Sequence, residues 1–302
     1  MNIKDFSEVM NKLNEKTNEQ NKKINLFQKK FEEEIKNIGS ILEGIEMTSF
    51  GRLTSNDDNT NISNDKEIFN FFIYSIHSNF LSSGYKTLKS INLLLVDLPC
   101  GDIMALLRRY TETLYFFIFF VFLYEKYNKF EKTKKEKIKK WMNLKDKELL
   151  NFRSVNAFII ENKIIEEILN LLKINSKFLT TKRERLNDFI HYNGFLYLNY
   201  DKLDFEKKYE FIEEILNEIK LYTKIFILFC TTNCEYFCTS SDYVDCLELG
   251  IEPVEGTQYI MMPILDKYVM ENFNEEEINY VRNHSSLKFG NEADWFMDSI
   301  QC

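Results

Sequence analysis

Proline and glycine are scarce in this sequence, which has three prolines and nine glycines among its 302 residues. Both residue types interrupt helices, so a chain that has few of them can form long ones. Large apolar side chains are plentiful by comparison, with 27 phenylalanines and 16 tyrosines. The length is ample for a hydrophobic core. We therefore expect an all-α protein.

Long apolar runs are also missing. The most apolar segment, Thr113 to Leu123, is flanked by charged residues on both sides. It is far shorter than the roughly 20 residues that a membrane-spanning helix needs. This segment therefore predicts a buried central helix and no stable membrane insertion. Met1 is followed by a polar, charged stretch that does not resemble a signal peptide, so we expect a cytoplasmic protein.

Paired C-x-x-C spacings, typical of zinc sites, are absent. Cys230, Cys234 and Cys238 recur every four residues, which on a helix forms a single stripe and not a zinc knuckle. Buried free thiols in a reducing compartment are the simpler interpretation. We expect no metal and no cofactor.

The net negative charge lies at one end of the chain. The net charge is −8, yet residues 242–302 alone carry 13 acidic against 3 basic side chains. The preceding residues are therefore slightly basic. Because the field near a site depends on local charges, the overall acidity does not exclude a nucleic-acid partner. Residues 241–302 are predicted to be an acidic C-terminal extension.

Residues 1–46 carry a heptad repeat in which ten of the thirteen a and d positions are apolar. A repeat of this length needs a partner helix over its apolar seam. That partner is either a second copy, which would make a coiled-coil homodimer, or the body of the same chain; of these we favour the homodimer. The seam residues are Ile3, Phe6, Met10, Leu13, Thr17, Gln20, Ile24, Phe27, Phe31, Glu34, Ile38, Ile41 and Ile45.

Residues 47–66 lose the helical periodicity and are rich in Ser, Thr, Asn and Asp, which predicts a polar linker. The helical periodicity then resumes, so residues 67–240 are predicted to form a helical bundle. Asp102 is a candidate cap for a helix from Ile103 to about Phe130. A further helix is expected over residues 145–173, and others are expected over about 179–192 and 205–236. One or two acidic helices follow within residues 264–283.

A lysine-rich segment lies between two of these helices. Residues 126–140 hold eight lysines against two glutamates, which fits either a solvated helix end or a surface that attracts phosphates. The candidate RNA-binding residues are Lys132, Lys134, Lys135, Lys137, Lys139 and Lys140.

Arg185 and His191 form the most suggestive polar pair, with Asn187 and Asp188 between them. Arginine is permanently charged, whereas histidine changes charge near neutral pH. Together they could bind a phosphate and transfer a proton. Supporting polar residues lie just before the apolar segment on the helix that carries it, namely Arg108, Arg109 and Glu112.

The spacing of Arg185 and His191 resembles the R-x(4–6)-H motif of HEPN domains, and the resemblance covers about residues 67–240. It implies a HEPN-like helical bundle and a metal-independent endoribonuclease that leaves 2′,3′-cyclic phosphate ends. Such an enzyme could be the effector of a phage-defence or toxin–antitoxin system, with an antitoxin or another protein as partner. Leu186 departs from the pattern, because family nucleases commonly have a polar residue directly after the arginine.

In that chemistry, histidine would serve as general base or acid, and the arginine fork would stabilise charge on the phosphorane. On a regular helix, however, positions 185 and 191 lie about 120° apart. A composite site across a dimer would bring both groups to one phosphate. The alternative is a non-catalytic HEPN-like protein that binds or senses partners through its coiled coil and acidic tail. In that case Arg185 simply pairs with Glu184 or Asp188, and Arg108 with Glu112.

Overall fold

A computed structural model of the chain describes residues 3–55, 80–95, 99–126, 131–133, 135–136, 152–191 and 205–290. The described residues are mostly helical and contain no strand beyond two isolated bridges. The all-α prediction is therefore confirmed. The helices are α1 (Ile3–Ser55), α3 (Phe80–Leu94), α4 (Cys100–Lys126), α6 (Phe152–Glu161), α7 (Lys163–Leu171), α8 (Ser176–His191), α10 (Phe205–Asn233), α11 (Asp242–Glu248), α12 (Pro263–Asn272) and α13 (Glu275–His284), with short 3-10 turns η3 (Glu235–Phe237) and η4 (Thr257–Tyr259).

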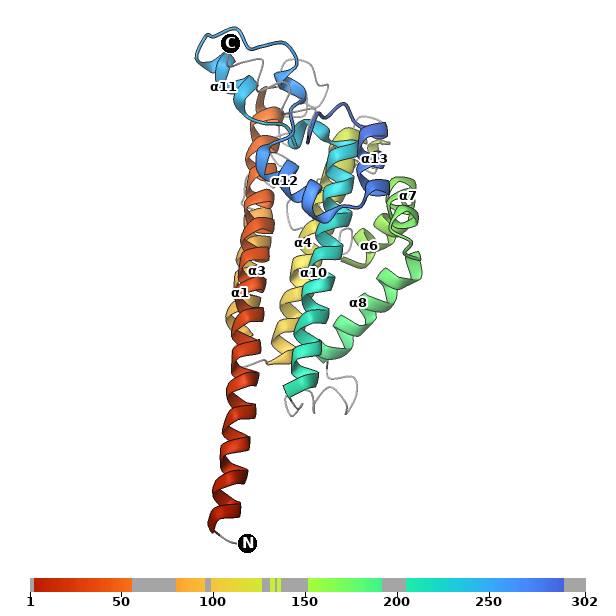
Figure 1. Ribbon diagram of the computed structural model, residues 1–302. Helices are drawn as coiled ribbons and strands as arrows, with labels where there is room; N and C mark the ends of the chain where they lie inside the picture. The colour runs from red at the N-terminus through yellow and green to blue at the C-terminus, as the bar shows by residue number, and fades with distance from the viewer. Residues whose placement is uncertain are drawn as a thin grey trace.

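Helix α4 is the centre of the bundle, because it packs against α3, α6, α8 and α10. In Figure 1, α1, α3, α4 and α10 run alongside one another, and α8 crosses them obliquely. The apolar segment predicted for this helix is buried from Thr113 to Phe122 except at the half-buried Phe116. No helix in the described part of the chain is both long enough and apolar enough to cross a membrane.

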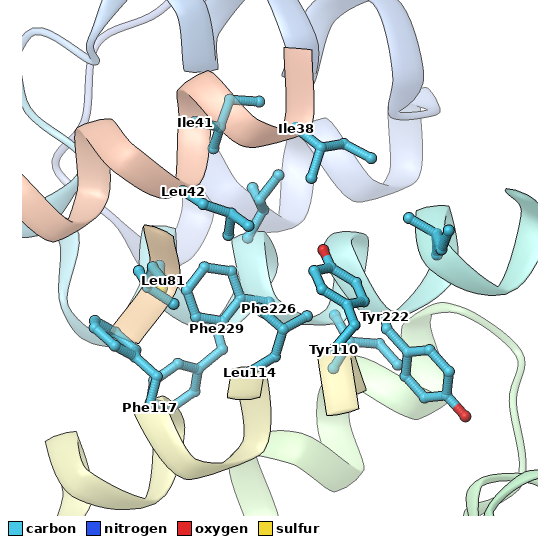
Figure 2. Close-up of a cluster of buried hydrophobic side chains, with 14 of the residues drawn as sticks. Ile38, Ile41, Leu42, Leu81, Tyr110, Leu114, Phe117, Tyr222, Phe226 and Phe229 are labelled. Atoms are coloured by element: carbon cyan, nitrogen blue, oxygen red, sulfur yellow. The ribbon is translucent and has the colours of Figure 1, made fainter. Parts of the chain in front are cut away.

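The core is built where α1, α3, α4 and α10 meet. Figure 2 shows a cluster to which α1 contributes Ile38, Ile41 and Leu42, and which α4 and α10 complete with aromatic and aliphatic side chains. The rings of Phe117 and Phe226 meet edge to face at 5.4 Å. Such aromatic pairs stabilise the packing of two elements by more than the burial of their apolar area alone contributes. Aromatic residues therefore account for the close packing of α4 against α10.

Helix α1 is a single helix that runs through the predicted boundary at residue 47 and ends at Ser55. Thr48 lies within the helix, and its hydroxyl donates to the carbonyl of Gly44 at 3.0 Å, so the polar group is satisfied there. The rest of the predicted linker, residues 56–66, lies outside the described residues. From Phe27 to Ile45 the seam of the heptad repeat is buried, except at position 34, and α1 packs there against α3, α10, α12 and η3.

Glu34 occupies the one polar d position within this buried stretch, and the structure explains it. Its carboxylate accepts from Lys220 of α10 at 3.0 Å, so two opposite charges meet between the helices. A charged seam residue is tolerated because its partner comes from the same chain. For the C-terminal half of α1, the helix that covers the seam is therefore part of this chain's own body.

Glu46 joins α1 to the start of α3. Its carboxylate accepts the backbone N–H groups of Leu81 and Ser82 and, at 2.8 Å, the hydroxyl of Ser82. The first N–H groups of a helix have no partner within it, and a carboxylate also suits the positive end of the helix dipole. Glu46 is itself buried. A side chain of one helix thus fixes where the next begins.

Residues 145–173 were expected to form one helix, whereas the described part of this range forms two, α6 and α7. Asn162 separates them. Its backbone is extended, and its side chain accepts from the N–H groups of Ile164 and Ile165. Asparagine is a favoured N-cap residue, so it starts a new helix instead of continuing the old one. Residues 145–151 lie outside the described part.

Helix α4 begins at Cys100, earlier than predicted, so Asp102 lies inside the first turn and is not the cap. Its carboxylate still suits the positive helix end. The predicted end of this helix, residues 127–130, lies outside the described residues.

The described part of the acidic extension packs on the bundle. Helix α12 contacts α1 and α13 contacts α10, and both contribute fully buried side chains such as Leu265, Val269 and Val281. Asn274 caps α13 in a capping box with Glu277, whose carboxylate also accepts from Lys224 of α10 at 2.8 Å. The acidic residues of α13 are therefore placed at its positive end. Residues 291–302 lie outside the described part.

Candidate functional site

Helix α8 carries the predicted motif and packs mainly against α4. Among the residues of α8 whose exposure is described, the buried ones are Leu179, Leu186 and Phe189, each about 2% exposed. Their spacing is that of one helical face. Leu186, the residue that departs from the family pattern, is therefore a core residue. On a neighbouring part of the helix surface, Lys182 and Arg185 extend to α10.

Arg185 is bound by carboxylates of α10. Both of its terminal nitrogens donate to Glu214, with Nη2 to Oε2 at 2.8 Å, and Nη1 also lies 3.4 Å from Oε1 of Glu218. Its guanidinium carbon lies 5.9 Å from the centre of the Phe189 ring. A two-pronged arginine–carboxylate pair is among the stronger polar contacts in proteins. The fork of Arg185 is therefore already engaged by protein groups.

Lys182 makes the same connection one helical turn earlier. Its Nζ donates to Glu218 at 2.5 Å and to Glu214 at 3.2 Å. Two cations of α8 thus share two carboxylates of α10. The hydrogen bond from Arg185 is the largest cause that lowers the pKa of Glu214, and the charges of Arg185 and Lys182 act in the same direction. Glu214 is consequently ionised at neutral pH.

A hollow of about 320 Å³ lies beside this cluster. It is bordered by four glutamates and one lysine, and one carboxylate oxygen of the buried Glu218, Oε2, has no hydrogen-bond partner among the described residues. A phosphate placed here would meet like charge. The lining residues are Phe178, Lys182, Glu210, Glu213, Glu214, Asn217, Glu218 and Leu221.

His191 is the last residue of α8, and its side chain is outside the described part of the structure. The helix is continuous from Ser176 to His191, so positions 185 and 191 lie about 120° apart around its axis. Asn187 and Asp188 are half-buried, and Asp188 takes part in a further interaction. A regular helix does not by itself bring the predicted catalytic pair together.

The other predicted residues occupy separate positions. Arg108 donates to Glu112 at 2.7 Å within α4, and both side chains are about one quarter exposed. Arg109 is exposed, and its carbonyl accepts the Thr113 hydroxyl. Of the lysine-rich segment, Lys132 is exposed and Lys135 half-buried, whereas Lys134, Lys137, Lys139 and Lys140 lie outside the described residues.

The three spaced cysteines are buried at the end of α10 and just beyond it. Burial raises the pKa of Cys230 and of Cys238, so neither is a ready thiolate. Within the described ranges no group of histidine, cysteine and acidic side chains has the arrangement of a metal site.

Sequence reasoning missed the residues that hold Arg185. Three glutamates recur every four residues in α10, namely Glu210, Glu214 and Glu218. In α8, Lys182 and Arg185 are three residues apart. These spacings place like charges on one face of each helix. A pairing of the two faces could have been proposed from that pattern, but only the fold shows that α8 and α10 are the helices that meet.

Comparisons with known proteins supply no identity, since no family model, curated protein or solved structure matches this chain.

Proposed function

We propose that this chain is a non-catalytic, HEPN-like helical protein that binds partners, with α1 as its principal interaction element. The observation that carries the proposal is the pairing of Arg185 with Glu214. An arginine that stabilises a phosphorane must present its N–H donors to the phosphate oxygens. Here both terminal nitrogens are bound to a carboxylate, beside a hollow whose lining includes four glutamates and one lysine.

In this proposal Arg185 is a structural residue. It connects α8 to α10 across a polar part of their interface, while Leu186 and Phe189 bury the neighbouring face. Such a pair helps to fix the position of one helix on another, and removing one partner leaves the other charge poorly compensated. We therefore expect Arg185→Ala to lower the thermal stability of the protein.

The test is incubation of the purified full-length protein with total RNA in EDTA, followed by analysis of the RNA ends for 2′,3′-cyclic phosphate. Wild type, Arg185→Ala and His191→Ala are compared with a protein-free control. We expect all four samples to give the same amount of cyclic ends, and expression of the three proteins to be equally harmless to growth. Cleavage by wild type that both substitutions abolish would overturn the proposal.

The second candidate is the metal-independent endoribonuclease that the motif implies. The observation in its favour is that Arg185 and His191 share one short helix, and that the Arg185 side chain is 23% exposed and bound to Glu214, which lines the hollow. In this candidate Glu214 would release Arg185 when RNA binds, and a second copy would complete the site. RNA would be the substrate, and the protein would act as a toxin or phage-defence effector restrained by an antitoxin.

A matched variant separates the two candidates. Glu214→Gln keeps the size of the side chain and removes the charge that holds Arg185. If the protein is a nuclease, freeing Arg185 should increase RNA cleavage relative to wild type. If Arg185 is structural, the same substitution lowers stability and produces no cleavage at any protein concentration.

A further inference from the structure

The N-terminal half of α1 extends beyond all other described helices (Figure 1). We call residues 3–26 the arm; at 1.5 Å per residue it is about 36 Å long. The contact of Phe27 with Tyr209 near the start of α10, with ring centres 5.2 Å apart, is where the body begins. The arm residues whose exposure is described are nearly all exposed, namely Asn14, Glu15, Thr17, Asn18, Glu19, Lys22, Lys23, Asn25 and Leu26, with Gln20 half-buried.

The arm and the buried half of α1 share one heptad register. Phe27, Phe31, Ile38, Ile41 and Ile45 are 7% exposed or less, and they occupy a and d positions. The same positions in the arm are Ile3, Phe6, Met10, Leu13, Thr17, Gln20 and Ile24. In the body, α3, α10 and α12 cover this stripe; along the arm, no other described element does. A lone helix with an apolar stripe of this length gains stability only when another helix covers it.

We infer that the arm pairs with the arm of a second copy of this chain in antiparallel orientation. The inference rests on the proposal that α1 is the interaction element. The direction of pairing follows from the shared register, because the same stripe that is open along the arm is covered by the body beyond Phe27. A parallel partner helix that followed this stripe past Phe27 would therefore run into α10 and α3 of the first copy. An antiparallel partner instead runs towards Ile3, and its own body lies beyond the far end.

Antiparallel arms match each other along their whole length. When Ile3 lies beside the partner's Phe27, Phe6 meets the partner's Ile24, and Leu13 meets the partner's Thr17. Each polar seam residue then packs against an apolar one, since Gln20 meets the partner's Met10. The twofold axis passes close to Glu15, so Asn14 lies level with the partner's Lys16, and the two Asn14 positions are offset along the axis by only about 3 Å. Every layer is supplied twice by symmetry, as a closed dimer requires.

Sedimentation of the full chain tests the pairing. We expect wild type to be a dimer, and Leu13→Lys to be monomeric because it places a charge in the seam. Its dimer dissociation constant should rise by roughly a hundredfold or more. The matched control is Asn11→Lys, which adds the same charge outside the seam and should remain dimeric. The thermal midpoint of the body should be unchanged in both. A monomeric wild type, or a dimeric Leu13→Lys, would overturn the inference.

Crosslinking with a short bismaleimide tests the direction of pairing. Asn14→Cys should give a covalent dimer and Ile3→Cys should not, because antiparallel arms place the two Ile3 positions about 36 Å apart. The reverse pattern would show parallel arms and contradict the inference. Wild type treated with the same bismaleimide shows how much crosslinking the native cysteines give. RNA cleavage by the same preparations would instead overturn the proposed function and leave the result on pairing intact.

Discussion

Tyr110 and Thr223 are two fully buried hydroxyls that bond to each other at 2.7 Å. Thr223 also lies 2.7 Å from the carbonyl of Ile219 and donates its one proton there. Tyr110 must therefore donate to Thr223. Burial raises the pKa of Tyr110, so the proton that it donates is retained at neutral pH. The direction of this hydrogen bond follows from counting protons.

This direction predicts an asymmetry between two substitutions. Tyr110→Phe removes the donor and leaves Thr223 bonded to Ile219, so we expect a loss of about 0.5–1.5 kcal/mol in the free energy of unfolding. Thr223→Val leaves the buried hydroxyl of Tyr110 without its acceptor and should cost more, about 1–3 kcal/mol. Urea denaturation of both variants checks the order. Equal losses, or a larger loss for Tyr110→Phe, would contradict the assigned direction.

Glu214 predicts a pH dependence. Its pKa in the folded protein lies below the ordinary value of 4.5, mainly because Arg185 donates to it. Its ionised form therefore stabilises the fold fully above pH 4.5, and this contribution is lost as the pH falls through the lowered pKa. The difference in unfolding free energy between wild type and Glu214→Gln should therefore become smaller as the pH is lowered. Urea denaturation at neutral pH and at about pH 3.5 measures it. A difference that stays constant would mean that Glu214 is not held by charge.

At the scale of single elements, Gly39 of α1 determines how closely α3 approaches. A Cβ atom at this position would lie 2.2 Å from the ring of Tyr85, whereas one at Gly101 in α4 would meet nothing within 4 Å. Gly-to-Ala changes in helices normally stabilise by up to about 1 kcal/mol. We expect Gly101→Ala to follow that rule and Gly39→Ala to destabilise. Thermal denaturation of the pair checks this. A stabilised Gly39→Ala would show that Tyr85 moves aside at little cost.

The cap on α3 offers a second test at this scale. Glu46→Ala leaves buried N–H groups of Leu81 and Ser82 without their acceptor, at a cost of about 1–3 kcal/mol. Glu46→Gln keeps one carbonyl oxygen and should cost less. Amide hydrogen exchange at Leu81 and Ser82 should accelerate in Glu46→Ala. Unchanged exchange there would mean that the cap contributes little.

For the whole molecule, the packing of α12 and α13 predicts that they unfold together with the bundle. Leu265→Ala removes a fully buried side chain and should cost about 2–5 kcal/mol. Circular dichroism and tyrosine fluorescence should then report one shared transition at a lower urea concentration. A separate early transition would instead indicate that residues 263–290 form an independent unit.

The sequence by itself determined the helical class, the central place of the apolar segment in α4 and the heptad stripe of α1. These follow from local composition and from periodicity, which depend only on neighbouring residues. The break at Asn162 was also encoded locally, as a favoured capping residue, although it was not predicted. The continuation of α1 to Ser55 was not apparent, because polar residues such as Thr48 fit helices and loops alike.

Only the tertiary structure decided which groups meet. It pairs Arg185 with Glu214, Glu34 with Lys220 and Lys224 with Glu277, and each pair joins residues distant in sequence. It also divides one heptad stripe into a half that its own body covers and a half that extends beyond it. Periodicity places a residue on a face of its helix, but the energy of a charge or of an apolar face depends on what lies opposite, which the packing of all the helices determines.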